Sequence, residues 1–143
     1  MLIGQIELLS RLFGRVLVPP AVLAELMHPV APKPVRDWAV NAPAWLEIRS
    51  PRSSLLLRHL DEGESEAIAL AAEMCADVLL MDEHAGRQEA VRRGLKVAGT
   101  LSVLDEAEKA GLVEFDEAVA DLQKTSFRVS QAVLAAIRAR RTR

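Results

Sequence analysis

The sequence predicts an α/β fold, a three-layer sandwich in which a mostly parallel sheet is covered by helices on both faces. Short apolar runs alternate with helical segments along the chain, as they do where helical crossovers join parallel strands. The run VLLM at 78–81 is apolar at every position, as in a strand that is buried on both sides. Half of the 143 residues are apolar and 27% are charged, a composition sufficient for one core. We therefore expect a single domain over 1–143, with the helices at about 116–140 as an appendage.

The first half of the chain supplies two of the expected strands. Apolar side chains at helical spacing predict a helix over residues 2–13, which Gly14 ends. The run RVLV then predicts a strand. Proline is favourable in a first helical turn, so the following PAVLAELM predicts a helix that starts directly after this strand. HPVAPKP is expected to be irregular, VRDWAV to be a brief helix and WLEIR to be a short strand.

The second half continues the alternation. A helix is expected over 63–75, the buried strand over 78–81 and a further helix from about 83 to 93, which Gly94 ends. LKVAG predicts the next strand, and SVLD at 102–105 has the spacing of a capping box at the start of a helix. Two more helices are expected near 116–123 and 130–140.

Composition and charge exclude several classes of protein. No stretch approaches the roughly 18 apolar residues of a membrane span, so we expect no membrane partner. The single Cys75 excludes an intramolecular disulfide and fits a reducing, cytoplasmic compartment. The net charge is −2, but no acid follows Asp121, and the basic tail that does follow could approach phosphates or be a solvated helix end. The candidate contacts in this tail are Arg138, Arg140 and Arg141.

Three carboxylates from distant segments are predicted to meet at one edge of the sheet. Asp82 directly follows the strand VLLM, Glu25 lies on the helix after RVLV, and Glu64 begins the helix that leads back to VLLM. Ligands of such folds bind where the carboxyl ends of parallel strands converge. Clustered carboxylates are tolerated where a cation neutralises them, and oxygen ligands suit Mg²⁺ or Mn²⁺. The pattern therefore makes these acids candidate metal ligands and catalytic residues.

Other interpretations of these residues stay open. Glu66 is an alternative to Glu64, although its helical stripe includes Glu73, as expected of a solvated face. Asp82 could be only a helix N-cap, and Glu64 could only complement a helix dipole. Arg87, about a turn beyond Asp82, could contact a phosphate, pair with a site carboxylate or lie on the surface. An acidic edge would also suit the phosphoacceptor pocket of a receiver domain, but no acid pair follows the first strand.

Three segments together resemble bacterial and archaeal PIN-domain proteins. They are IGQIELLSRLFGRVLVPPAVLAEL, GESEAIALAAEMCADVLLMDEHAGR and GLKVAGTLSVLDEAEKAGLV. More narrowly, they are similar to a subgroup related to the toxins of VapC-type toxin–antitoxin pairs. The resemblance implies a Mg²⁺- or Mn²⁺-dependent endoribonuclease that hydrolyses RNA phosphodiesters, with Glu25, Glu64 (or Glu66) and Asp82 in the positions of family acids. It also implies a small antitoxin protein as a partner and a homodimer.

The sequence departs from this family at its beginning. Members normally start with a central strand ending in an Asp-Thr-Ser or Asp-Ser-Ser motif, whose aspartate is the first metal ligand. Here no residue takes that position, because Met1 falls where the following helix is under way. A sheet without that strand is expected to have two unpaired inner edges. Either the native chain starts upstream, or it is a catalytically inactive PIN-like module that binds protein or RNA.

Overall fold

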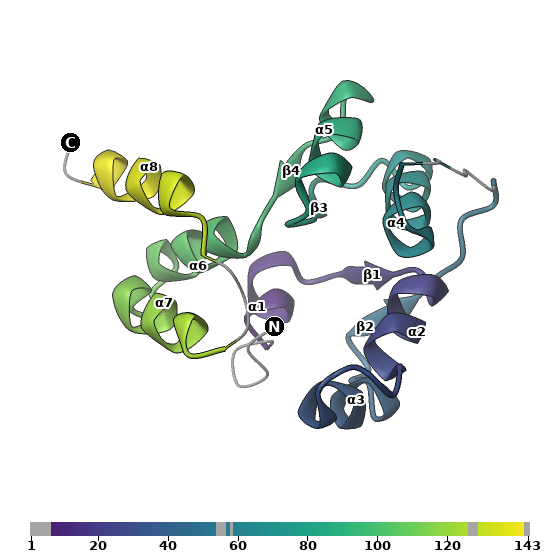
Figure 1. Ribbon diagram of the computed structural model, residues 1–143, viewed down its shortest axis with the longest axis horizontal. Helices are drawn as coiled ribbons and strands as arrows, with labels where there is room; N and C mark the ends of the chain where they lie inside the picture. Colours follow the sequence, from purple (N-terminus) through teal and green to yellow (C-terminus); the bar gives the residue numbers. More distant parts are fainter. Residues whose placement is uncertain (1–6, 54–56, 58, 126–128, 142–143) are drawn as a thin grey trace.

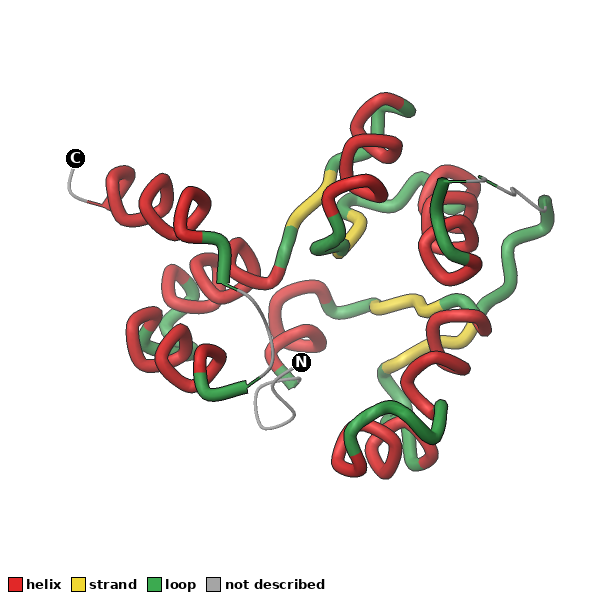
Figure 2. The backbone as a smooth tube through the Cα atoms, viewed as in Figure 1, coloured by secondary structure: helices red, strands yellow, loops and turns green. Residues whose placement is uncertain are grey.

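The computed structural model describes residues 7–53, 57, 59–125 and 129–141 (Figures 1 and 2). The first residues of the helix expected over 2–13 lie outside the described residues, and the described part of this helix is α1, which begins at Leu8. The helices are α1 (Leu8–Phe13), α2 (Pro20–Met27), α3 (Lys33–Val40), α4 (Glu62–Glu73), α5 (His84–Arg92), α6 (Thr100–Lys109), α7 (Phe115–Gln123) and α8 (Gln131–Arg141). The strands are β1 (Val16–Val18), β2 (Leu46–Ile48), β3 (Leu79–Leu80) and β4 (Val97–Ala98). The α/β class predicted from the sequence is confirmed.

All strand pairs in the described residues are parallel, and they form two separate sheets. Strand β1 pairs with β2, and β3 pairs with β4 (yellow in Figure 2). No described strand bridges the two pairs, which agrees with the unpaired inner edges expected from the sequence. Each of these strands therefore has one edge without a partner among the described residues.

The helices α2 and α4 pack together beside the β1–β2 pair. Helix α2 starts at Pro20, immediately after β1, as the proline pair predicts. Helix α4 buries Ile68 and Ala71 on one stripe, the stripe that also carries Glu64. Its first turn is closed by a reciprocal capping box between Asp61 and Glu64. This cap fixes the position of both carboxylates relative to α2.

The largest apolar cluster lies at the other end of the molecule, between α1, α6, α7 and α8 (Figure 1). We call this cluster the helical core. Helices α7 and α8, expected as an appendage, contribute half or more of its buried side chains. Its buried members are Leu8, Leu101, Leu104, Ala107, Phe115, Ala118, Val119, Leu122, Leu134 and Ile137. The C-terminal helices thus share one core with the N-terminal helix.

Helix α6 begins earlier than its sequence indicates. Ser102 was expected near the helix start, but the helix begins at Thr100 after Gly99. Glycine offers no side-chain cap, and the free amide of Thr100 is instead bound by a carboxylate from another segment, described below. Within the described residues, none of the helices is long and apolar enough to cross a bilayer.

Candidate carboxylate site

Glu25 lies on α2 and points at the start of α4. Its carboxylate lies against the backbone of Gly63, whose N–H favours the charged form of this carboxylate. A β-carbon at position 63 would meet Oε1 of Glu25, so this glutamate side chain would have to move if the glycine were replaced. Burial raises the pKa of Glu25, and the negative charges of Asp61 and Glu62 raise it further. Glu25 is therefore a carboxylate held close to other acids, with a backbone amide as its favourable contact.

Glu64 has one satisfied oxygen and one without a partner. Its Oε1 accepts from the backbone N–H of Asp61 at 3.4 Å, and its own N–H donates to Asp61 Oδ1 at 2.8 Å. Its Oε2 is buried and has no hydrogen-bond partner among the described residues. A β-carbon at Gly86 would lie 2.6 Å from Oε2 and would also meet the sulfur of Met81, so both side chains pack closely against this glycine. Burial, Asp61 and the charge of Glu83 raise the pKa of Glu64.

Asp82 lies two residues beyond the end of β3, and its carboxylate caps α6. The strand is only half-buried, so the prediction of a strand buried on both faces was wrong. Oδ1 accepts from the backbone N–H of Thr100 at 2.8 Å, and Oδ2 accepts from Thr100 Oγ1 at 2.7 Å. A β-carbon at Gly99 would lie 2.8 Å from Asp82 Oδ1 and 3.3 Å from Arg87 Nη1. Asp82 and Arg87 thus both lie over Gly99. Asp82 caps α6 and not α5, the helix that follows it, because the N-cap residue of α5 is Glu83.

The structure brings together Glu25, Asp61 and Glu64, which we call the acidic cluster. Asp61 raises the pKa of both glutamates, so its charge lies close to each. The sequence argument missed Asp61, although the spacing Asp-x-x-Glu at 61–64 is a capping-box signal. Asp82 is not brought into this cluster, because its oxygens are bound to Thr100. The acid from this segment whose charge raises the pKa of Glu64 is Glu83.

The acidic cluster suits a divalent cation in its chemistry and is incomplete in its geometry. An orphaned buried oxygen and mutually repelling carboxylates are features that a hard cation would satisfy. However, no three side chains of His, Cys, Asp or Glu in the described part of the chain come close enough to hold a metal ion. Asp82 would have to leave Thr100 to join Glu25 and Glu64 in the predicted set of ligands.

Glu66 does not lie on a solvated face, although its helical stripe in the sequence indicated one. It is partly buried, and its Oε1 accepts from the backbone N–H of Ala21 at 3.2 Å. This contact satisfies a free donor in the first turn of α2 and ties α2 to α4. Glu66 consequently has a clear structural role, which distinguishes it from Glu64 with its unpartnered oxygen.

Two of the three arginines of the basic tail that were expected to contact nucleic acid are bound within the protein. Arg141 donates to Asp105 at 2.8 Å, pairs with Glu108 at 2.5 Å and lies 4.3 Å from the centre of the Phe115 ring. Arg138 pairs with Asp116 at 3.1 Å. Arg140 is exposed on α8. The basic tail was expected to be free because the acids it pairs with lie 22 to 36 residues earlier in the chain.

The parallel strand pairs and their crossover helices define an α/β protein with acidic side chains beyond the carboxyl ends of β1 and β3. A family model described as a PIN domain matches residues 1–142. The chain belongs to the PIN-domain family, and the resemblance seen in the sequence is confirmed at that level. The receiver-domain interpretation is thereby superseded. Comparisons with curated proteins and with solved structures gave no match.

Proposed function

We propose that this protein is a metal-dependent endoribonuclease of PIN type, which binds Mg²⁺ or Mn²⁺ through Glu25, Glu64 and Asp82. The observation that carries the proposal is the buried Oε2 of Glu64, which has no hydrogen-bond partner in the described part of the chain and lies against Gly86. A buried carboxylate oxygen without a donor is costly, and a cation is the ligand that removes this cost. Family membership supplies the reaction class, and a cytoplasmic location fits it.

The proposed role of each residue follows from its position. Glu25 and Glu64 would hold the cation, which supplies charge neutralisation at the phosphodiester and activation of water. Asp82 would reach the same cation only after releasing Thr100. Arg87 lies on the Asp82 side, over Gly99, where its guanidinium can hold a phosphate oxygen. A small antitoxin protein and a homodimer are the partners that the toxin-like subgroup implies.

Cleavage of single-stranded RNA in the presence of Mn²⁺ tests this proposal. We expect Glu25→Gln, Glu64→Gln and Asp82→Asn each to lower the cleavage rate by roughly a hundredfold or more, because each removes a charged ligand. Glu62→Gln is the matched control, since Glu62 is an exposed acid in the same first turn of α4. Glu66→Gln should also retain activity, because the amide oxygen can still accept from Ala21. Equal loss in Glu62→Gln and Glu64→Gln would contradict the assignment.

The alternative function is a catalytically inactive PIN-like module that binds RNA or protein. The observation that favours it is the engagement of both Asp82 oxygens by Thr100, which leaves the acids without a common point. Thermal unfolding with and without Mn²⁺ separates the two functions. A metal site predicts stabilisation of about 1 kcal/mol at five times the Kd, and none in Glu64→Gln. If the protein bound RNA but did not cleave it, and if Mn²⁺ did not raise its thermal stability, it would be the inactive module.

A further inference from the structure

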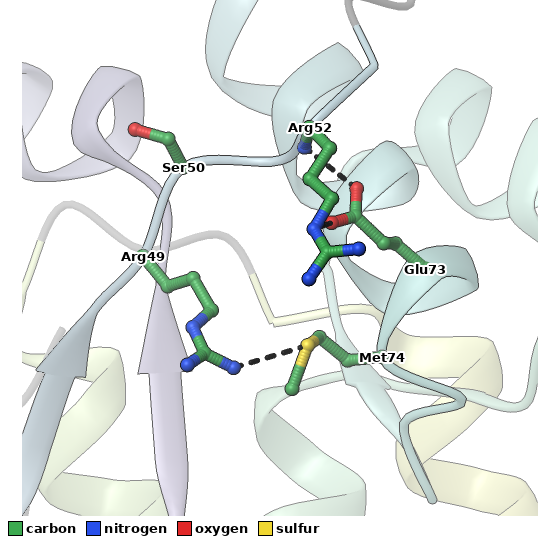
Figure 3. Close-up of a pocket in the computed structure, with 5 residues that line it drawn as sticks. All are labelled: Arg49, Ser50, Arg52, Glu73 and Met74. Carbon is green, nitrogen blue, oxygen red and sulfur yellow. Dashed lines mark hydrogen bonds and ion pairs between the residues drawn. The ribbon is translucent and has the colours of Figure 1, made fainter.

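A hollow of about 320 Å³ lies between the segment that follows β2 and the end of α4, apart from the acidic cluster (Figure 3). Its lining consists of Arg49, Ser50, Arg52, Glu73 and Met74. We propose that this hollow binds a phosphodiester group of single-stranded RNA through Arg49 and Arg52. The identity of the ligand as RNA rests on the proposed function.

The position of the hollow fits ligand binding in a parallel sheet. Arg49 is the first residue after β2, and its backbone N–H donates to Val18 O at the end of β1 at 3.0 Å. The hollow therefore opens beyond the carboxyl ends of both strands of this pair. This is the side of an α/β sheet on which ligands bind, because the loops that leave the strands converge there.

Both guanidinium groups are directed into the same space, and neither is saturated with partners. Nη1 of Arg49 donates to the sulfur of Met74 at 3.3 Å, and a thioether is a weak acceptor. Nε of Arg52 lies 3.7 Å from Glu73 Oε1, and 93% of the Arg52 side chain is exposed. In Figure 3 the two side chains extend toward Glu73 and Met74, whereas the Ser50 hydroxyl points away from them.

The charges around the hollow leave an excess of positive charge. Glu47, which lies 3.6 Å from Arg49 Nη2, is already bound on both oxygens by Arg15 at 3.0 and 3.3 Å. Glu73 is bound by Arg52, whose backbone N–H donates to Glu73 Oε2 at 2.7 Å and whose guanidinium pairs with Oε1. Three guanidinium groups thus face two carboxylates, so one positive charge remains for an anion. Arginine is suited to phosphate because its planar fork can donate two parallel hydrogen bonds.

The size of the hollow favours one unit of a flexible strand over a duplex. Its volume is at the lower end of the roughly 300–1,000 Å³ that ligand pockets occupy. A single phosphate with part of its ribose is a ligand of this scale, and a second or third phosphate would remain in solvent. The hollow would therefore anchor the RNA strand at a distance from the acids that would cleave it.

RNA binding in the presence of EDTA tests the hollow without cleavage. Fluorescence anisotropy of a labelled single-stranded oligoribonucleotide compares the wild-type protein with Arg49→Gln/Arg52→Gln. We expect roughly tenfold weaker binding and a salt dependence that is shallower by about 0.7 per lost phosphate contact. The matched control is Lys33→Gln/Lys124→Gln, which removes two exposed positive charges elsewhere and should change affinity less than about twofold.

A second variant separates binding from folding. Arg49→Lys/Arg52→Lys keeps both charges and loses the guanidinium fork, so its affinity should lie between those of the wild type and the glutamine variant. If Lys33→Gln/Lys124→Gln lost as much affinity as Arg49→Gln/Arg52→Gln, or if the wild-type protein did not bind RNA, the hollow would be overturned as an RNA site. Hollow-dependent binding without cleavage would instead refute only the ribonuclease. Cleavage that persists unchanged in Arg49→Gln/Arg52→Gln, with unchanged binding, would refute only the hollow.

Discussion

The helical core and the acidic cluster give their carboxylates opposite electrostatic surroundings. In the helical core, the buried Asp105 is bound by Arg141 and Lys109. In the acidic cluster, Glu25 and Glu64 have other acids as neighbours, and Glu64 Oε2 has no partner within the described residues. The pKa values move accordingly. Arg141 and Lys109 lower that of Asp105 although burial opposes them, whereas burial and repulsion raise those of the glutamates.

This difference indicates which charged groups add to the free energy of unfolding and which lower it. Charged groups in the helical core are paired, so they contribute to holding α6 and α8 together. Unpaired carboxylates at the start of α4 oppose folding, and a protein retains such groups where a ligand compensates them. The contrast therefore supports a structural role for the C-terminal helices and a binding role for the acidic cluster.

The largest expected effect comes from the helical core. Leu122 on α7 is fully buried among the other helices of this core. Truncation in Leu122→Ala leaves a cavity and should lower the free energy of unfolding by about 3 kcal/mol. Val30, 84% exposed between α2 and α3, provides the control, and Val30→Ala should cost less than about 0.5 kcal/mol. Urea unfolding monitored by circular dichroism measures both, and a loss of similar size in the two variants would refute the helical core as the stabilising region.

A smaller effect is expected from the ion pairs of α8. Arg141→Ala should lower the free energy of unfolding by about 2 kcal/mol, because it leaves the buried Asp105 without its strongest partner. Arg138→Ala removes a pair with Asp116 in which both side chains are more than half exposed, so it should cost about 0.5 kcal/mol or less. The same unfolding measurement applies. Equal costs would mean that Arg141 is as solvated as Arg138, contrary to its contacts.

The smallest effect has the opposite sign and depends on pH. Glu64→Gln removes a carboxylate that Asp61 and Glu83 repel, while the amide can still serve in the capping box. We expect a gain of about 0.5 kcal/mol at neutral pH. The pKa of Glu64 is raised in the folded protein, so this carboxylate destabilises the fold once the pH exceeds the ordinary glutamate range. The gain should therefore vanish as the pH falls below that range.

Asp105→Asn should behave in the reverse way. The pKa of Asp105 is lowered in the folded protein, so its carboxylate stabilises the fold above the ordinary aspartate range and loses this effect as the pH falls through the lowered pKa. The cost of Asp105→Asn should thus be largest at neutral pH. Unfolding curves at several pH values compare the two variants, and parallel pH profiles would contradict the distinction between the two regions.

Local signals in the sequence predicted the elements well. Apolar periodicity, the proline pair before α2 and the glycines after α1 and α5 located most boundaries within a few residues. Asp82 was placed correctly just beyond the carboxyl end of β3, because a residue so close to the end of a strand has little freedom in position. The start of α6 was misplaced, since its cap comes from Asp82, 18 residues away, and no local pattern records such a contact.

By itself, the sequence determined the α/β class, the order of strands and helices and the family, since all of these depend on local pattern. The tertiary structure alone decided which charges meet. It paired Arg141 with Asp105, bound Glu66 to Ala21, turned Asp82 to Thr100 and left Glu64 Oε2 without a partner among the described residues. It also divided the strands into two pairs. The physical reason is that ion pairing, burial and strand pairing depend on distances between residues that the chain brings together only when it folds.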